Sequence, residues 1–347
     1  MTNLFCDFDL SIEMQKAIQD MHYEQMTEIQ AGAIPAILAG RDMIGHSSTG
    51  TGKTAAFGIP IIEKVQQKES RKPQVLILCP TRELEMQISG ELRKYAKYKQ
   101  GIKIATVYGG EAMINQIRQL KGAAIVVGTP GRVMDHMRRG TLKLDEIQTV
   151  VLDEADEMLN MGFLEDMQTI LQGVPEERQT LLFSATMPAS ILKITKQFQK
   201  NPQLIAISKG QRSMDAISQF YYTVSVEQKK EALNLLLQKM NPKRSIVFCN
   251  TKKMVDELVF YLNECGFHSI GLHGDMRQAA RTQVMQDYKN GRIQILVATD
   301  VAARGIDVED IDAVFNYDIP QEDEYYIHRI GRTARAGKKG SSYTLVC

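Results

Sequence analysis

The sequence predicts an α/β protein made of two parallel-sheet domains. Short apolar runs rich in β-branched residues recur along the chain, and each is followed by a turn and a helix-like stretch. The runs are continuous instead of alternating, which is typical of strands buried on both faces of a sheet. The chain has 347 residues, which is too many for one ordinary core, so length alone favours about two domains.

Two series of apolar runs are separated by a polar stretch, SKGQRSMDAIS, that follows a strand-like QLIAIS. We therefore expect a first domain at 1–207, a linker at 208–216 and a second domain at 217–347. The first series of predicted strands lies within 74–80, 102–110, 123–130, 149–156 and 180–186, and the second within 244–250, 293–300, 312–318 and 342–346.

Composition narrows the class of protein. The net charge of +1 neither implies nor excludes a nucleic-acid partner, because a local basic groove can hide in a neutral total. The chain contains no apolar run long enough for a membrane span, and its acidic N-terminus does not resemble a secretory signal. The 5 cysteines are scattered without C-x-x-C spacing, which suits free thiols and argues against a zinc site or disulfides. We expect a cytoplasmic protein.

Polar clusters follow most of the predicted strands. They read TREL, GG, TPGR, DEAD, SAT and TDVAARGID. Open α/β sheets bind ligands outside the carboxyl ends of their strands, so these clusters should line one edge of each sheet. Ordinary turn chemistry would explain any one cluster, but it explains poorly six clusters rich in Asp, Arg and Thr.

The segment SSTGTGKT at 47–54 nearly fits the phosphate-loop pattern G-x-x-x-x-G-K-[ST], with Ser47 in place of the first glycine. Gly50 and Gly52 allow the positive φ angles that bring backbone N–H groups close to phosphate. Lys53 would reach the β and γ phosphates, and the Thr54 hydroxyl would coordinate Mg²⁺. The alternative is a turn that matches the pattern by chance.

An acidic pair supplies the partner that a phosphate loop needs. Asp153 directly follows a predicted buried strand and is suited to help hold Mg²⁺. Glu154, next to it, could activate the attacking water as a general base. The alternative is a helix N-terminus, where carboxylates stabilise the helix dipole. That alternative does not explain why the pair follows a buried strand in a chain with a G-K-T loop.

Taken together, these motifs resemble the DEAD-box ATP-dependent RNA helicases in both order and spacing, from Phe5 to the last predicted strand. The resemblance implies two RecA-like domains of the P-loop NTPase fold, with ATP and Mg²⁺ in the cleft between them and RNA across both on one face. The motifs that support it are SSTGTGKT (47–54), PTREL (80–84), GG (109–110), TPGR (129–132), DEAD (153–156), SAT (184–186), TDVAARGID (299–307) and HRIGRTAR (328–335).

The resemblance also implies roles at the nucleotide. Phe5, Tyr23 and Gln30 match the adenine-reading positions, and a Gln amide can both donate to and accept from adenine. Arg332 and Arg335 match the arginines that reach the γ-phosphate, and Asp307 matches the acid that contacts the ribose. The implied nucleotide-binding set is completed by Ser47, Ser48, Thr49, Gly50, Thr51, Gly52, Lys53, Thr54 and Gly305, and the implied coupling set is Asp156, Ser184, Thr186, His328 and Arg329.

RNA contacts are implied mostly for the sugar–phosphate backbone, so we expect weak sequence preference. The choice of RNA over DNA comes from the resemblance alone. The matching positions are Pro80, Thr81, Arg82, Gly109, Gly110, Thr129, Pro130, Gly131 and Arg132 in the first domain, and Asn250, Gly274, Arg281, Thr299, Asp300 and Arg304 in the second.

Five positions depart from the family pattern. Ser47 stands where alanine is usual, and we expect little effect because both are small. His22 and Met26 replace a glycine and a proline in the adenine motif, and the methionine removes a φ restraint on the loop that carries Gln30, which should loosen adenine selectivity. Glu85 replaces an alanine, and its carboxylate would repel RNA unless it points into solvent or pairs with Arg82 or another base. Ala334 replaces a glycine, which is acceptable if its φ is negative.

The leading hypothesis is an RNA-stimulated ATPase that unwinds short RNA duplexes or remodels ribonucleoprotein. An ATP-gated RNA clamp with little unwinding is the first alternative, and a DNA translocase or an inactive scaffold are weaker ones. Expected partners are single-stranded RNA, short RNA duplexes and proteins of ribosome assembly or RNA decay, with no membrane. The chain ends on a predicted strand, and we expect the second domain to continue beyond it. Oligomeric state and the physiological RNA stay open.

Overall fold

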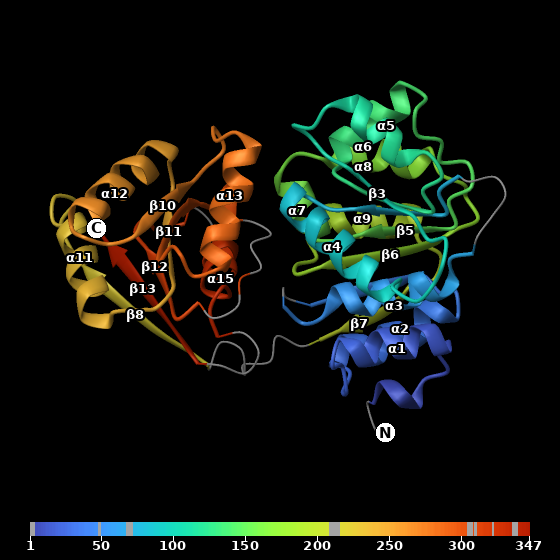
Figure 1. The fold of residues 1–347 in the computed structure, drawn as a ribbon, viewed down its shortest axis with the longest axis horizontal. Helices are drawn as coiled ribbons and strands as arrows, with labels where there is room; N and C mark the ends of the chain where they lie inside the picture. Colours follow the sequence, from blue (N-terminus) through green and yellow to red (C-terminus); the bar gives the residue numbers. More distant parts are fainter. Residues whose placement is uncertain are drawn as a thin grey trace. The chain divides into compact units, whose positions relative to one another are not determined.

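The structure is a computed structural model that describes residues 4–47, 50–66, 72–207, 216–303, 308, 311–320, 323–334 and 339–347. Contacts divide the chain into two compact units, Met1–Ser208 and Lys209–Cys347. The linker expected at 208–216 lies outside the described residues except for its last position. Each unit is a separate α/β body (Figure 1).

The first unit contains a sheet of 7 strands in the order β3-β4-β2-β5-β6-β1-β7. Every described pairing in it is parallel, as the sequence predicted. All five strands predicted in the first series are present, and the strand-like QLIAIS contains β7. The strands are β1 (Met43–His46), β2 (Val75–Leu78), β3 (Ile104–Val107), β4 (Ile125–Gly128), β5 (Thr149–Leu152), β6 (Gln179–Ser184) and β7 (Gln203–Ala206).

Helices cover both faces of this sheet, because successive side chains of a strand point to opposite faces. Val75 and Ile77 of β2 join the core beneath α1 to α4, whereas Leu76 and Leu78 join the core beneath α5 to α9. The helices are α1 (Ile12–Asp20), α2 (Glu28–Leu38), α3 (Lys53–Lys64), α4 (Arg82–Tyr95), α5 (Met113–Leu120), α6 (Pro130–Arg138), α7 (Ala155–Asn160), α8 (Leu164–Gln172) and α9 (Ala189–Phe198), with a short 3-10 helix, η1 (Phe5–Asp7), before them.

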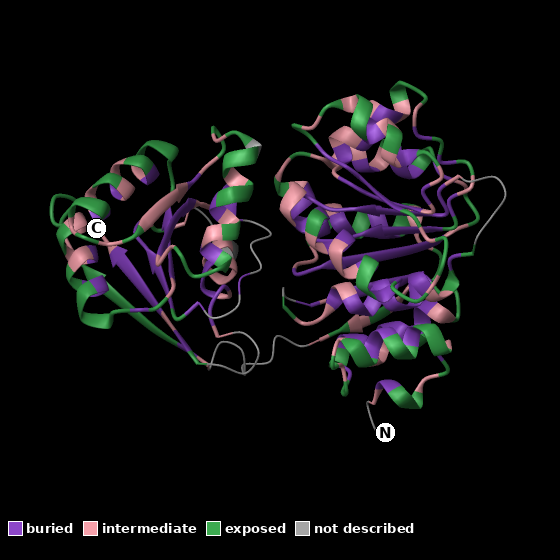
Figure 2. Cartoon of the chain, viewed as in Figure 1, coloured by how far each residue is buried: buried purple, intermediate pink, exposed green. Residues whose placement is uncertain are grey.

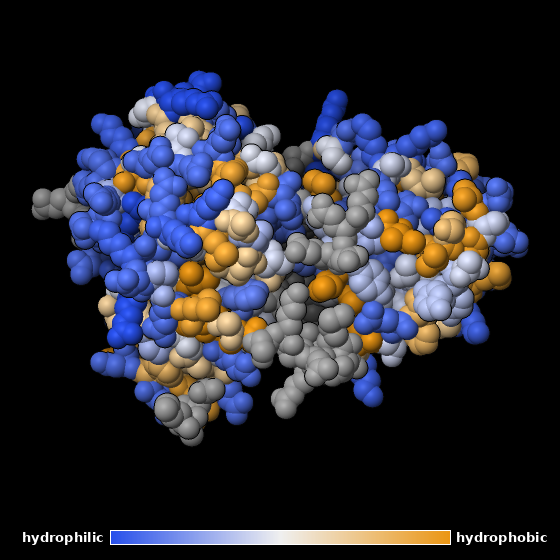
Figure 3. All heavy atoms as spheres, turned by 180° about the vertical axis from the view of Figure 1, so that it is seen from behind, coloured by the Kyte–Doolittle hydropathy of each residue, from blue (hydrophilic) through white to orange (hydrophobic). Residues whose placement is uncertain are grey.

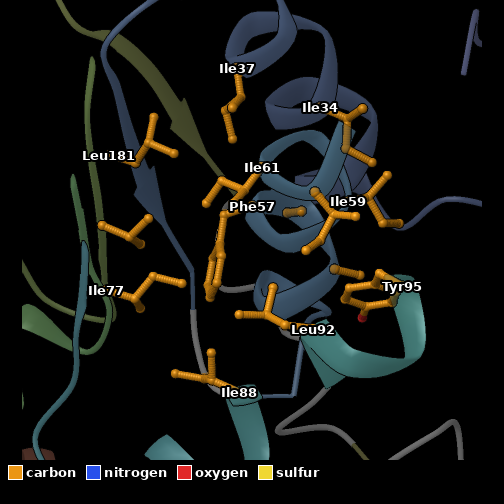
Figure 4. Close-up of a cluster of buried hydrophobic side chains, with 14 of the residues drawn as sticks. Ile34, Ile37, Phe57, Ile59, Ile61, Ile77, Ile88, Leu92, Tyr95 and Leu181 are labelled. Atoms are coloured by element: carbon orange, nitrogen blue, oxygen red, sulfur yellow. The ribbon is translucent and has the colours of Figure 1, made fainter. Parts of the chain in front are cut away.

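The core beneath α3 is shown in Figure 4. Phe57 of α3 points toward Ile77 and Leu181 of the sheet, and α4 contributes Ile88 and Leu92 to the same cluster. This close packing holds α3 firmly on the sheet, and α3 is the helix that follows the phosphate loop.

The second unit contains a sheet of 6 strands in the order β10-β11-β9-β12-β13-β8, again with only parallel pairings in its described part. The four predicted strands are confirmed. The strands are β8 (Ile217–Thr223), β9 (Ser245–Cys249), β10 (Ser269–Leu272), β11 (Ile295–Thr299), β12 (Ala313–Asn316) and β13 (Gly340–Val346), and the helices are α11 (Lys229–Met240), α12 (Lys252–Glu264), α13 (Gln278–Lys289), α14 (Asp300–Ala303) and α15 (Asp323–Ile330).

The predictions omitted three strands, and burial explains two of them. β8 and β10 lie at the two edges of their sheet, and each has a single buried residue, Ile217 and Leu272. Both are covered less completely than the central strands of the same sheet, so their sequences lack a continuous apolar run. Figure 2 shows the contrast between the buried central strands and the exposed β8. The third, β1, has only four residues and ends in His46.

Hydrophilic side chains cover most of the face shown in Figure 3, with apolar ones scattered among them. Within the part of the chain that the structure describes, no helix is long and apolar enough to cross a membrane.

Candidate functional site

The strand order of the first sheet separates two sets of predicted residues. The neighbours β5, β6 and β1 precede the predicted nucleotide and coupling residues, whereas β2, β4 and β3 precede the predicted RNA residues. All carboxyl ends of a parallel sheet lie along the same edge, so the two sets occupy adjacent parts of one edge. The roles of both sets stay predictions.

The phosphate loop lies between β1 and α3. Gly50 and Gly52 have φ angles of 79° and 91°, in the left-handed region that favours glycine. A Cβ atom on Gly52 would also lie 2.5 Å from Nε2 of Gln30, so backbone and packing both demand glycine there. Ser48 and Thr49 lie outside the described residues.

Lys53 begins α3 and is buried. Its Nζ donates to the Ser47 carbonyl oxygen at 3.3 Å. The Ser47 hydroxyl accepts a hydrogen bond from Thr51 Oγ1 at 3.1 Å. Ser47 is itself buried, which fits the expectation that a small residue is needed at this position. The serine adds an internal hydrogen bond to the loop that an alanine could not make.

Asp153 lies directly after β5 with its carboxyl buried. Burial raises the pKa of Asp153 to about 7, and the nearby Lys53 ammonium opposes that rise. Asp153 Oδ1 accepts from the backbone N–H of Glu154 at 3.1 Å. A bound divalent cation would favour the ionised carboxylate.

The donor set fits Mg²⁺. This ion takes only one or two carboxylates from the protein and keeps water and phosphate as its other ligands. Asp153 and the Thr54 hydroxyl supply such a minimal set. Among the described residues, no group of three or more His, Cys, Asp or Glu side chains could hold a metal by itself.

Glu154 has a φ of 51° and precedes the first residue of α7. A left-handed conformation costs a non-glycine residue roughly 1–2 kcal/mol, and such residues cluster at functional sites. Glu154 is therefore held in an unfavourable backbone conformation directly after the predicted metal ligand.

Of the predicted adenine-reading residues, Phe5 and Tyr23 contact each other near the N-terminus, and Gln30 contacts the phosphate loop. The rings of Phe5 and Tyr23 stack with centroids 5.9 Å apart, beside a cavity of about 690 Å³. Gln30 accepts from the Thr27 backbone N–H at 2.9 Å and donates to the Gly52 carbonyl oxygen at 3.2 Å. Gln30 therefore ties the adenine motif to the phosphate loop.

Two of the family departures fall in this segment. Met26 is buried in the core of the first unit, so it packs in place of the usual proline. His22 has a φ of 55°, a conformation that suits the glycine it replaces. The strained residue is thus the histidine, next to Tyr23.

Asp156 links DEAD to SAT. Its Oδ2 accepts hydrogen bonds from Ala185 N at 3.1 Å, Thr186 N at 2.8 Å and Thr186 Oγ1 at 3.0 Å. The Ser184 hydroxyl in turn accepts from the backbone N–H of Asp156 at 3.2 Å. His46, which the motifs did not single out, adds a contact of 3.1 Å between its Nε2 and the Ala185 carbonyl oxygen. These bonds connect the ends of β1, β5 and β6.

Tyr108, which precedes Gly109, contacts Arg82 and is linked through Gln116 to Arg132. The Arg82 guanidinium lies over the Tyr108 ring at 4.0 Å and donates to its hydroxyl at 3.2 Å. Gln116 donates to the Tyr108 carbonyl oxygen at 2.7 Å and accepts from Arg132 Nη1 at 3.2 Å. Tyr108 and Gln116 hold the two arginines, and neither belongs to a motif that could have revealed it.

The remaining positions of this set are turns and helix starts. Thr81 caps α4 by accepting from Leu84 N, and Thr129 precedes Pro130, the first residue of α6. Gly110 has a φ of 86°. A Cβ atom on Gly109 would meet nothing within 4 Å, and a Cβ atom on Gly131 would come no closer than 3.8 Å to its nearest neighbour. Internal packing therefore does not require glycine at 109 or 131.

Glu85 lies in the first turns of α4, and among the described residues its carboxyl meets neither condition under which repulsion of RNA would be avoided, since it neither points into solvent nor pairs with a base. The residue is 0% exposed, and neither carboxyl oxygen has a hydrogen-bond partner of good geometry among the described residues. Burial raises the pKa of Glu85 to about 9, so the carboxyl is neutral at pH 7.

Arg329 organises the predicted residues of the second unit. It is 1% exposed and donates to both oxygens of Asp300 at 2.6 Å, and to Asn250 Oδ1 at 3.0 Å. Asn250 Nδ2 also donates to the Ile319 carbonyl oxygen at 2.9 Å. The polar side chains of Asp300 and Asn250, both predicted to contact RNA, are therefore engaged inside the unit.

Other predicted residues of this unit lie at strand ends or on helices. Thr299 ends β11, and Gly274 follows β10, where a Cβ atom would meet nothing within 4 Å. Arg281 of α13 donates to the carbonyl oxygens of His273 and Ala302, both at 3.4 Å. His328 of α15 accepts, through its carbonyl oxygen, from Arg332 Nε at 3.2 Å. The predicted residues Arg304, Gly305, Asp307 and Arg335 lie outside the described part of the chain.

Ala334 has a φ of 55°, so the condition under which alanine would be acceptable there is not met. The backbone keeps the left-handed conformation that suits the usual glycine, and the alanine is strained in it.

Comparison with known proteins agrees with this arrangement. A model described as DEAD/DEAH box helicase matches residues 27–194, and one described as Helicase conserved C-terminal domain matches residues 228–337. The ATP-dependent RNA helicase CshA of Listeria monocytogenes is 51% identical over 343 residues, which cover 99% of this chain and 66% of that protein. The DEAD-box ATP-dependent RNA helicase CshA of Geobacillus kaustophilus is also 51% identical, with 99% of this chain and 73% of that protein covered.

A solved structure has the same fold. S. cerevisiae Dbp5 bound to RNA and ADP BeF3 superimposes with a TM-score of 0.90 at 34% identity, covering 99% of this chain and 89% of that one. Motif order, two parallel sheets and identity to curated relatives over nearly the whole chain agree. The chain belongs to the DEAD-box family of ATP-dependent RNA helicases.

Proposed function

We propose that this chain hydrolyses ATP in an RNA-stimulated manner and uses the cycle to unwind short RNA duplexes or remodel ribonucleoprotein. The observation that carries the proposal is the bonding of Asp156 to Ala185 and Thr186. It joins the segment after β5, which includes the predicted metal ligand and base, to the segment after β6. A change at the nucleotide can therefore alter the backbone after β6 through these bonds.

ATP and Mg²⁺ are the proposed ligands of the phosphate loop. Bound Mg²⁺ would neutralise charge on the phosphate oxygens during transfer. Lys53 and the backbone N–H groups of the loop would bind the phosphates, with Asp153 and Thr54 holding the metal. Glu154 would accept the proton of the attacking water. The ionised form of Asp153 is the one competent to bind the cation.

RNA is the proposed partner of Arg82, Arg132 and the turns after β3 and β4. The similarity to Dbp5, which was solved with RNA, supports this assignment. Guanidinium groups suit phosphate oxygens, and a glycine such as Gly109 lets the backbone approach a phosphate closely. Sequence preference should be weak because such contacts address the sugar–phosphate backbone.

We also propose a cytoplasmic location and partners in ribosome assembly or RNA decay. The location is supported by the five free cysteines, two of them exposed, which suit a reducing compartment. The family membership is what favours an RNA-processing partner.

The decisive test measures ATP turnover with and without RNA, strand displacement, and complex lifetime on the same preparation. We expect RNA to stimulate turnover and ATP to drive displacement of a short duplex. Long-lived ATP-dependent binding without displacement would instead establish the RNA clamp. Equal stimulation by single-stranded DNA would favour a DNA translocase.

The matched control is Lys53→Ala, which should abolish turnover because the phosphates lose their buried ammonium. Wild-type turnover by that variant would contradict the assignment of the nucleotide site.

A further inference from the structure

Glu85 is the least compensated polar side chain of the predicted RNA region. It lies on α4, three residues after Arg82, and both of its carboxyl oxygens are buried without a well-formed hydrogen bond in the described structure. The backbone of Val107, on β3, favours the ionised carboxyl but does not offset its burial. A buried carboxylate without partners is costly, so the carboxyl keeps its proton.

The charged groups that act on this carboxyl include both predicted RNA-contacting arginines. Arg82, on the same helix, and Arg132, of α6, favour its ionised form, whereas Glu111, after β3, opposes it. Glu85 also acts on Cys79, the buried thiol after β2, and on Tyr108. Loss of the proton would therefore place a negative charge close to Arg82 and Arg132.

Arg82 is held by a neutral partner, whereas Arg132 has two neutral partners and also pairs with the half-exposed Asp135 carboxylate, whose Oδ2 lies 3.7 Å from its Nε. Arg82 bonds to the Tyr108 hydroxyl, and Arg132 bonds to the Glu111 carbonyl oxygen at 3.0 Å and to Gln116. The neutral partner of Arg82 leaves its positive charge available to a phosphate, and the pair of Arg132 with the half-exposed Asp135 is weakened by solvent screening. A new carboxylate would attract these guanidinium groups and repel phosphate at the same time.

We propose that Glu85 is a positioning residue for RNA binding, whose buried carboxyl must stay protonated for Arg82 and Arg132 to engage the phosphate backbone. The inference rests on the proposed binding of RNA to these arginines. It predicts that this chain loses RNA affinity at alkaline pH, a property that a chain with alanine at position 85 would lack.

The test measures the dissociation constant of a fluorescent oligoadenylate at constant salt for the wild type, Glu85→Gln and Glu85→Ala. Oligoadenylate is used because adenine has no group that titrates in the alkaline range. Glutamine imitates the protonated carboxyl, and alanine is a second variant in case glutamine impairs folding. Circular dichroism at each pH verifies that every variant stays folded.

The matched control is Glu177→Gln. Glu177 belongs to the same unit and pairs with Lys200 on the surface, with side chains 93% and 56% exposed. It is the same Glu-to-Gln replacement as Glu85→Gln, made without touching the buried cluster. Its pH profile should match that of the wild type.

We expect the dissociation constants of the wild type and Glu177→Gln to rise about fourfold more than those of the Glu85 variants between about pH 7 and about pH 9.5, as the protonated fraction falls. Superimposable profiles for the wild type and the Glu85 variants would overturn this inference alone. Absence of oligoadenylate binding by any variant at any pH would overturn the proposed function together with it.

Discussion

Arg329 and Asp300 form a bidentate ion pair in the interior of the second unit. Arg329 Nε donates to Asp300 Oδ1 and Nη2 donates to Oδ2, both at 2.6 Å, and the arginine is 1% exposed. The pair joins α15 to the start of α14, and Asn250 after β9 accepts from the same guanidinium. Motif order suggested a coupling role for Arg329 and an RNA contact for Asp300. Their geometry shows that the two residues form a buried ion pair that stabilises the fold.

Asp300→Asn should therefore destabilise the second unit. The variant leaves a buried guanidinium without its counter-ion, which costs about 3–5 kcal/mol. Urea unfolding measures the loss. The control is Asp275→Asn, which breaks the exposed pair with Lys252, whose side chains are 60% and 61% exposed, and should change stability little. Normal stability with weakened RNA binding in Asp300→Asn would restore the RNA-contact role.

Glu154→Gln should slow ATP hydrolysis by about 10²-fold or more while nucleotide still binds, because the amide cannot accept a proton from water. Single-turnover hydrolysis and nucleotide binding, measured in parallel, separate the two effects. Wild-type hydrolysis would rule out Glu154 as the general base. Loss of binding instead would point to a role in holding the metal beside Asp153.

Gly109→Ala should weaken RNA binding roughly three- to tenfold without lowering stability. A Cβ atom there meets nothing within 4 Å, and the φ of Gly109 is not in the left-handed range. The added methyl group would therefore collide only with a ligand that approaches the backbone closely. Gly90→Ala is the control, because Gly90 lies in α4 with equally open space. That variant should stabilise the helix by about 0.5–1 kcal/mol and leave RNA affinity unchanged. Equal RNA affinity of both variants would argue against an RNA contact at Gly109.

Glu85→Gln should stabilise the first unit, and more so as pH rises. Burial raises the pKa of Glu85 from 4.5 to about 9, so between these values the unfolded chain binds fewer protons than the folded one. The free energy of unfolding then falls with rising pH by up to about 1.4 kcal/mol per pH unit from this group. The stability it contributes is complete below the unfolded pKa and is lost as pH rises toward the folded one.

Urea unfolding at about pH 6 and about pH 8 measures the effect, and the advantage of the glutamine variant should grow by roughly 2–3 kcal/mol over that interval. An advantage that is the same at both pH values would show that Glu85 is already ionised when folded.

His22→Gly and Ala334→Gly should each stabilise the protein by about 0.5–1 kcal/mol. A residue with a side chain is strained at a left-handed φ, and the free energy of this strain exceeds the cost of the greater conformational entropy that glycine has in the unfolded chain. Both residues have a φ of 55°. Urea unfolding checks each variant. Gly90→Ala is the comparison, because Gly90 has no left-handed φ and alanine, not glycine, should be the more stable residue there. A loss of stability would mean that the side chain contributes contacts worth more than the strain.

Much of the fold follows from local pattern. Continuous apolar runs predicted β2 to β6 and β9, β11, β12 and β13, because a strand covered by helices on both faces must be apolar throughout. The polar clusters after these runs could be placed at one edge of each sheet, because the carboxyl ends of parallel strands lie along the same edge. The edge strands β8 and β10 escaped the prediction because they are only partly covered.

By itself, the sequence determined the α/β class, most strands and the identity of the motif residues, since these depend on spacing along the chain. Only the tertiary structure decided what each side chain meets. It showed that Glu85 is buried, and that Arg329 finds Asp300 across 29 positions and Asn250 across 79. Such partners come from distant segments brought together by strand order, and that order is set by packing of the whole sheet, which no local pattern records.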